Sequence, residues 1–260
     1  DLHAHLINLP TVIVCIALLY KSLALDKRKK FLINALPLGF LLGVMFMTST
    51  WDFGNYLVLT GISTAVFYLH RKKFSLKSIF ASGVFIAVIL LTGLVGALPF
   101  ILNFTSIAKG VAFVKARTPI WQLGVLWGFP AILSLIFAAF ISKTKKVKLS
   151  DIFIGCLLIS SWLLIIIPEI IYVKDIYIAS HHRANTMFKL TYQAFVMFYI
   201  TSGYIAFRVI FCLKGIAVKT VSILFFTLLF AAIFWYPKFA RKSYYHDLKG
   251  YTGLSGSTWL

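Results

Sequence analysis

Apolar runs of about twenty residues recur along the chain and constrain its fold more than any other feature. Each is close to the ~20 residues that an α-helix needs to cross the hydrocarbon core of a bilayer. Backbone polar groups inside lipid must be satisfied within the segment, so every run is expected to be helical. The sequence therefore predicts an all-α, polytopic transmembrane bundle of about eight helices, at approximately residues 6–24, 31–50, 53–70, 78–102, 121–142, 151–173, 186–211 and 218–236.

Composition supports a membrane protein and argues against two other classes. The chain is 60% hydrophobic, which leaves too little polar sequence to cover a soluble globule of 260 residues. Its net charge of +19 would suggest nucleic acid in a soluble protein, but the basic residues lie in short clusters between apolar runs. Orientation in a membrane explains such clusters better, so no nucleic-acid partner is expected. Three cysteines within or at the ends of apolar runs do not form a disulfide or zinc pattern.

The connecting segments alternate in charge, which predicts the orientation of the bundle. Most of the lysines and arginines lie in every second connection, at 21–30, 70–78, 143–151 and near Lys214 and Lys219. The positive-inside rule places these connections in the cytoplasm. The other connections, at 51–55, 103–120, 169–186 and 237–260, are then outer loops.

Five of the seven acids fall on that outer, extracytoplasmic side: Asp1, Asp52, Glu169, Asp175 and Asp247. The chain begins at Asp1 without Met, so we expect residues 1–260 to be a single transmembrane domain cut from a longer protein. Ionisable groups at the edge of a membrane segment indicate function by default. The outer side is therefore the expected active face.

The DLHAH motif opens the first apolar segment. Its alternation puts Asp1, His3 and His5 on one side of an extended strand or loop, as potential ligands of a divalent metal or phosphate. Proton transfer through histidine is equally reasonable chemistry. On composition alone, imidazoles that simply lie at the level of the lipid headgroups are the favoured explanation.

The WDFGNY motif joins the second and third segments with almost no loop, so Asp52 is held close to the membrane surface. A catalytic role for Asp52 and a helix-capping role, in which it accepts backbone N–H bonds, are about equally supported.

The segment from Pro168 to Gln193 concentrates charged and polar residues between two apolar runs. Pro168 is expected to kink or break its helix, which places Glu169 near the break as a general base or cation ligand. The alternative is a salt bridge from Glu169 to Arg183 or Lys174 that only fixes the loop. Arg183 offers the planar fork that recognises phosphate or carboxylate.

Asn185, Lys189 and Gln193 follow at spacings of four and share one face if this segment is helical. With Arg183 and Asp175 they form the predicted phosphate- or substrate-binding set. Alone, Lys189 would be expected to extend its amine toward the membrane surface; together with the others, anion binding is favoured.

The outer loop 103–120 carries Lys109, Lys115 and Arg117 among apolar residues, which suits a segment lying in the membrane interface. Ordinary surface anchoring is favoured there over a specific contact with a lipid phosphate.

Three motifs together resemble the YYY membrane protein family (the Chlor_Arch_YYY domain) of archaea and Chloroflexi-type bacteria. They are DLHAH, WDFGNY, and PEIIYVKD followed by RANTMFKLTYQAF. Ala4 and Gly54 stand where that family has prolines, and Ser255 replaces an acid near the end. The family is similar in layout to the GT-C superfamily of polytopic glycosyltransferases. The resemblance implies a protein of the prokaryotic plasma membrane.

It also implies a transferase that moves a sugar from a polyprenyl-phosphate-linked donor at the extracytoplasmic face. Asp1, Asp52 or Glu169 would then act on the acceptor hydroxyl or hold Mg or Mn with His3 and His5, unless the principal acid precedes Asp1. A transporter or flippase-like protein, or a non-catalytic membrane scaffold, are the alternatives. Nearly charge-free helix interiors disfavour transport of a charged solute. The sequence does not indicate an oligomeric state.

Overall fold

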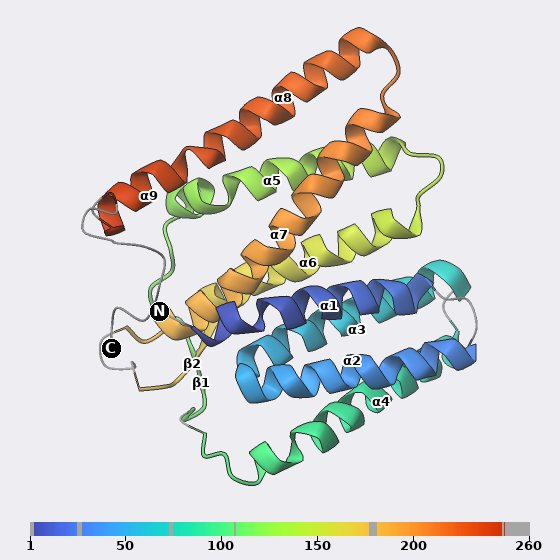
Figure 1. Cartoon of the computed structure of the whole chain (residues 1–260), viewed down its shortest axis with the longest axis vertical. Coiled ribbons are helices and arrows are strands. Elements are labelled where there is room, and N and C mark those ends of the chain that lie inside the picture. The colour runs from blue at the N-terminus through green and yellow to red at the C-terminus, as the bar shows by residue number, and fades with distance from the viewer. Residues whose placement is uncertain are drawn as a thin grey trace. The chain divides into compact units, whose positions relative to one another are not determined.

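The computed structural model describes residues 3–24, 28–72, 75–106, 108–176, 181–245 and 247. Each of the eight predicted apolar segments corresponds to one helix, α1 to α8, so the prediction of an all-α bundle is confirmed (Figure 1). The helices are α1 (Ala4–Ala24), α2 (Arg28–Thr48), α3 (Thr50–Lys72), α4 (Leu76–Ile101), α5 (Ile120–Lys143), α6 (Leu149–Ile170), α7 (Ala184–Cys212), α8 (Ile216–Phe234) and α9 (Tyr236–Tyr245).

Six segments of the described residues are helical, long and apolar enough to cross a membrane. They comprise α1, most of α4, α5, α6, α7, and a segment made of α8 with most of α9. Helix α2 contributes a shorter apolar stretch, Ile33–Thr48. Helix α3 is less apolar, because it carries a row of buried polar residues. They are Asp52, Asn55, Thr60, Ser63 and Thr64.

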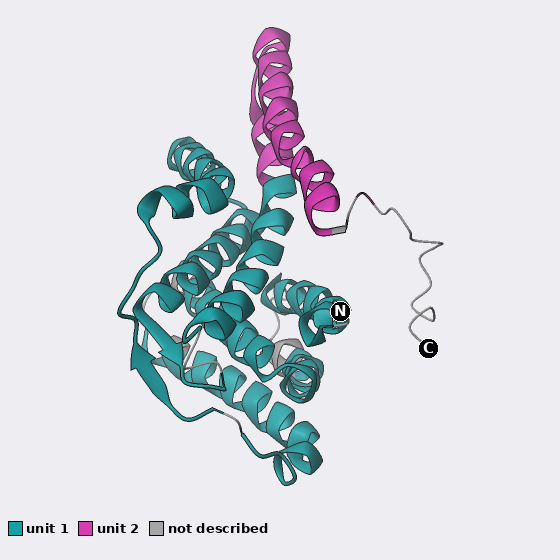
Figure 2. Ribbon diagram, turned by 90° about the vertical axis from the view of Figure 1, so that its left-hand side faces the viewer, with its two compact units in different colours: residues 1–204 teal, residues 205–260 magenta. Residues whose placement is uncertain are grey.

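The chain divides into two compact units, residues 1–204 and 205–260, and helix α7 runs from one into the other (Figure 2). In the first unit, successive helices run in opposite directions, so their connections gather at two opposite ends (Figure 1). We call one the basic end, because the α1–α2, α3–α4 and α5–α6 connections there are rich in lysine and arginine. The other, the polar end, contains the start of α1, the α2–α3 junction, the end of α6 and the start of α7.

Helices α2 and α4 approach each other most closely at three glycines. A Cβ atom on Gly43 would lie 2.6 Å from the Gly93 carbonyl oxygen, and one on Gly93 would lie 2.9 Å from the Gly39 carbonyl oxygen. Small residues that allow backbones to touch are typical of helix pairs in membranes, where lipid is as apolar as the side chains. Close backbone packing therefore holds this pair together.

The α2–α3 junction is tighter than predicted. Ser49 is the single non-helical residue between the helices, and its carbonyl oxygen accepts the backbone N–H groups of Asp52 and Phe53. Residues 51–55, expected to form an outer loop, are therefore the first turns of α3. This places Asp52 on a rigid helix instead of a loop.

Two outer connections meet in a small antiparallel sheet, which the sequence did not predict. Strand β1 (Val111–Phe113) pairs with β2 (Ile171–Val173), with Ala112 opposite Tyr172. Lys109 and Lys174 extend the ladder, because the Lys109 N–H donates to the Lys174 carbonyl at 2.8 Å. The sheet joins the predicted loops 103–120 and 169–186. It follows the end of α6, which stops two residues after Pro168.

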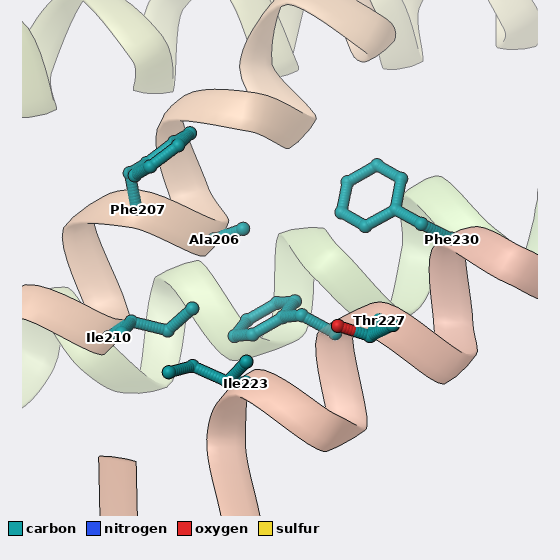
Figure 3. Close-up of a pocket in the computed structure, with 7 residues that line it drawn as sticks. Ala206, Phe207, Ile210, Ile223, Thr227 and Phe230 are labelled. Atoms are coloured by element: carbon teal, nitrogen blue, oxygen red, sulfur yellow. The ribbon is translucent and has the colours of Figure 1, made fainter. Parts of the chain in front are cut away.

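The second unit contains the last turns of α7 with α8 and α9. A pocket of about 310 Å³ lies between α7 and α8 (Figure 3). Its lining is apolar apart from the Thr227 hydroxyl, and such a lining offers little for catalysis. The lining residues are Ala206, Phe207, Ile210, Ile223, Phe226, Thr227 and Phe230. Helix α9 begins at Tyr236 and covers residues 237–245 of the predicted outer loop 237–260, whose residues 246 and 248–260 are outside the described part.

Candidate functional site

A fully buried carboxylate, that of Asp52, lies at the polar end of the first unit. Its Oδ1 is 2.9 Å from His5 Nδ1 and accepts a bond from Gln193 Nε2 at 2.8 Å. Its Oδ2 accepts a bond from Asn8 Nδ2, also at 2.8 Å. Three helices, α1, α3 and α7, thus converge on one acid. A buried carboxylate is costly unless it is hydrogen-bonded, and both Asp52 oxygens have hydrogen-bond partners.

A second layer of bonds surrounds this centre. The Tyr56 hydroxyl donates to Gln193 Oε1 at 2.8 Å, and Ser49 Oγ lies 3.3 Å from His5 Nδ1. All of these side chains are buried. We call the set the Asp52 network: His5, Asn8, Ser49, Asp52, Tyr56 and Gln193.

Local helix geometry explains why these residues meet. His5 and Asn8 are three residues apart on α1, and Asp52 and Tyr56 are four apart on α3, so each pair shares a helix face. Among the described contacts, the Asp52 carboxylate accepts bonds from side chains and not from backbone N–H groups. The capping alternative for Asp52 therefore finds no support in these contacts.

The pairing with Asp52 defines what the His5 ring can do. An ionised carboxylate can only accept hydrogen bonds, so beside an ionised Asp52 the shared proton belongs to His5 Nδ1. In the neutral ring, Nε2 then keeps its lone pair and can accept a proton. Aromatic rings hold the imidazole in place: His3 stacks on it at 5.5 Å between ring centroids, and Phe188 and Tyr192 contact it at 5.7 and 5.8 Å.

A row of polar residues on α7 leads to this network. Asn185 Nδ2 donates to Asp175 Oδ2 at 2.7 Å, and four residues further the Lys189 amine lies 5.4 Å from the centre of the Trp51 ring. Gln193 follows after another four residues. This segment is helical, so Asn185, Lys189 and Gln193 share one face of α7.

Lys189 itself is partly buried, and no carboxylate of the described residues lies within ion-pair distance of its amine. Its amine lies beside an aromatic face, and it is a cation close to the Asp52 network that is not neutralised by an ion pair among these residues, so it can meet an anion there.

A separate cluster contains the other predicted acid and its arginine. Arg183 Nη1 lies 2.8 Å from Glu169 Oε2, and Arg183 Nη2 donates to Thr118 Oγ1 at 2.9 Å. Thr118 in turn donates to Glu169 from both its backbone N–H, at 2.8 Å, and its hydroxyl, at 2.6 Å. Arg183 also reaches the Pro168 carbonyl. We call Thr118, Glu169 and Arg183 the Glu169 clamp. It has the form of the loop-fixing salt bridge that the sequence left as an alternative.

The structure thus divides the predicted residues into groups. His5, Asp52 and Gln193 meet directly, with Lys189 beside them, whereas Glu169 and Arg183 bond each other. Among the described contacts, the His3 side chain packs its ring against His5 and Phe188. Asp1 lies outside the described residues, as does the complete Asp1–His3–His5 arrangement.

The described residues contain no group of three or more His, Cys, Asp or Glu side chains placed to hold a metal. Sequence analysis missed Asn8, Ser49 and Tyr56. Asn8 had a signal, as a lone amide in an apolar run three residues after His5.

The fold and the site define an integral membrane protein with a buried, hydrogen-bonded acid at one end of a helical bundle. The chain matches the family model described as "Uncharacterized membrane protein (DUF2298)" over residues 1–155 and 131–198. It belongs to this family, which is the YYY type that its motifs resemble. No curated protein and no solved structure matches the chain.

Proposed function

We propose that this protein is a membrane-embedded transferase of the GT-C type, which moves a sugar from a polyprenyl-phosphate-linked donor at the extracytoplasmic face. The observation that carries the proposal is the buried His5–Asp52 pair with Lys189 nearby on α7. A proton acceptor and a cation are the two groups that this reaction needs from a protein.

His5 is the proposed general base. The acceptor hydroxyl would give its proton to His5 Nε2 as its oxygen bonds to the sugar C1 carbon, while the bond from C1 to the phosphate oxygen breaks. Asp52 positions the ring and stabilises the imidazolium that forms, as a carboxylate does for a catalytic histidine. Asp52 is then a positioning residue, because both of its oxygens are already bonded within the protein.

Lys189 is the proposed phosphate contact. The leaving lipid phosphate gains negative charge as the sugar departs, and a cation in a water-poor site stabilises that charge strongly. We favour Lys189 over Arg183 for this role, because the Arg183 guanidinium is already bonded to Glu169 and Thr118. Asn185 lies one turn before Lys189 on α7 and is bonded to Asp175, and this pair would border the donor headgroup.

A divalent metal is not part of the proposed steps. Among the described residues, His5 and Asp52 offer two potential ligands in contact, but their mutual hydrogen bond uses one ring nitrogen and one carboxylate oxygen. Both Asp52 oxygens and His5 Nδ1 are thus engaged in hydrogen bonds within the protein, and we assign no metal ligand to this pair.

The test uses the full-length protein in proteoliposomes with polyprenyl-phosphate-linked hexoses, radiolabelled in the sugar and supplied one at a time. Asp52→Asn keeps the size of the side chain but removes its charge. It should lower transfer by about 10² or more, because the general base His5 loses the carboxylate that orients its ring and stabilises the imidazolium, while binding of polyprenyl phosphate alone stays unchanged. Lys189→Gln should weaken that binding.

Lys238→Gln is the matched control for Lys189→Gln, because Lys238 also lies over a tryptophan, Trp235, at 4.9 Å. It should bind polyprenyl phosphate like the unaltered protein. Full transfer activity in a folded Asp52→Asn variant would refute the role of the His5–Asp52 pair. Failure of the unaltered protein to bind polyprenyl phosphate or to transfer any of the hexoses would refute the function itself.

A non-catalytic scaffold is the second candidate, and one observation favours it. The Asp52 carboxylate has hydrogen-bond partners on both oxygens from two other helices, as a purely structural acid would. On this account, Asp52→Asn lowers stability and the unaltered protein shows no transfer. Activity of the unaltered protein therefore separates the two candidates.

A further inference from the structure

The connection between α4 and α5 forms an exposed ribbon at the polar end that the proposed chemistry does not use (Figure 1). It contains Lys109, Val111, Phe113, Lys115 and Arg117, which we call the basic ribbon. Its three cations are exposed, and none has a carboxylate within ion-pair distance among the described residues. Unpaired cations on a fixed segment are available to an anion from outside the protein.

The apolar residues of the ribbon are exposed as well. Val111 is 60% and Phe113 78% exposed, whereas Ala112 between them is only partly so. This alternation is that of a β-strand with one face turned away from the protein. Ile120 and Trp121, at the start of α5, are 87% and 69% exposed and continue the apolar surface.

Hydrogen bonds at both flanks fix the ribbon to the bundle. The Lys109 N–H donates to the Lys174 carbonyl at 2.8 Å, and the Val114 N–H donates to the Ile170 carbonyl at 2.9 Å. Thr118, directly after Arg117, is held by the Glu169 clamp. A surface ordered in advance loses little conformational entropy when it binds a ligand.

The flanking helices fix its depth in the membrane. Residues Ile79–Ile101 and Ile120–Lys143 are both long and apolar enough to span a bilayer, and the ribbon connects them. A segment that joins the ends of two spans lies where hydrocarbon gives way to lipid phosphates. Aromatic and basic residues are both favoured at that level.

We propose that the basic ribbon is a binding surface for anionic phospholipid. Val111 and Phe113 enter the upper acyl region, and Lys109, Lys115 and Arg117 contact the lipid phosphates. The clamp and the β1–β2 ladder hold these groups in place before a lipid arrives. This inference does not depend on the proposed transfer reaction.

The experiment compares the full chain with Lys109→Gln/Lys115→Gln/Arg117→Gln, each purified in mild detergent and mixed with phosphatidylglycerol or phosphatidylcholine. Native mass spectrometry counts the lipids retained. The triple substitution should reduce the preference for phosphatidylglycerol by up to about a hundredfold, since each basic residue near a charged lipid surface contributes about fivefold and the three factors multiply. The preference in the unaltered protein should also fall as salt is raised.

The matched control is Lys143→Gln/Lys145→Gln/Lys146→Gln, which removes three exposed cations from the α5–α6 connection at the basic end. It should keep most of the preference. An equal loss in both triple variants would overturn the proposal, because net charge would then be the cause.

Phe113→Ser keeps every cation and should weaken retention of both lipids alike; no change in this variant would overturn the proposed apolar contact. Unchanged retention with millimolar inorganic phosphate is expected, and competition would show that the surface binds free phosphate instead.

Discussion

Gln193 bridges the two layers of the Asp52 network, so its replacement tests whether that network holds the bundle together. Gln193→Leu has nearly the same volume and leaves no large cavity. It removes the donor to Asp52 Oδ1 and the acceptor of the Tyr56 hydroxyl. His5 and Asn8 remain as partners of the carboxylate.

The expected loss of stability follows from these two bonds. A hydrogen bond to a charged group contributes about 1.5–3 kcal/mol. The bond between Tyr56 and Gln193 links neutral groups on two helices, which contributes about 0.6 kcal/mol on average in a membrane protein. We therefore expect a loss of about 2–4 kcal/mol. At the 2–4 °C per kcal/mol found for chains of about this size, the midpoint of thermal unfolding should fall by about 5–15 °C.

The chain provides its own reporters for this measurement. Cys15 and Cys156 are buried and Cys212 is exposed, so a thiol-reactive fluorescent dye on a Cys212→Ser background reports unfolding of the first unit. Gln122→Leu is the control, because Gln122 is exposed on α5 and the same chemical change there removes no buried bond. Equal unfolding midpoints for Gln193→Leu and Gln122→Leu would refute the structural role of the network.

Two further changes test other parts of the first unit. Gly43→Ala forces a methyl group to within 2.6 Å of the Gly93 carbonyl oxygen and should lower the midpoint by several degrees, whereas Gly61→Ala, with no neighbour within 4 Å, should leave it unchanged or raise it slightly. A tolerated Gly43→Ala would show that α2 and α4 separate freely. Arg183→Lys keeps the charge beside Glu169 but loses the planar fork, so it should increase proteolytic cleavage of the α4–α5 connection; full resistance would mean that charge alone holds the clamp.

Much of the fold was predictable because its signal is local. Twenty-residue apolar runs require helices in lipid, and all eight predicted segments correspond to helices. The β1–β2 pairing was not predictable, because it joins Val111 to Val173 and neither strand is long enough to show a period. Residues 51–55 are predicted as a very short outer loop between two apolar runs, but Ser49 alone suffices for the turn.

The candidate site was predictable in its components but not in its connections. The four-residue spacing of Asn185, Lys189 and Gln193 gave the polar face of α7 from the sequence. The spacing could not show that Gln193 meets Asp52, because the partners are 141 positions apart. The sequence also could not decide whether Arg183 binds Glu169 or an external anion. Only the folded structure shows the ion pair with Glu169.

The distance along the chain between Asp52 and Gln193 has a consequence for how the protein is made. His5 and Asn8 precede Asp52 and are already present when α3 leaves the ribosome, but Gln193 follows 141 positions later. At 5–20 residues per second, synthesis of that interval takes roughly 7–30 s. During this time, His5 and Asn8 are the described hydrogen-bond partners of the Asp52 carboxylate that already exist. The start of α1 therefore supplies the first hydrogen-bond partners of the buried acid on α3, and the insertion of α7 adds Gln193.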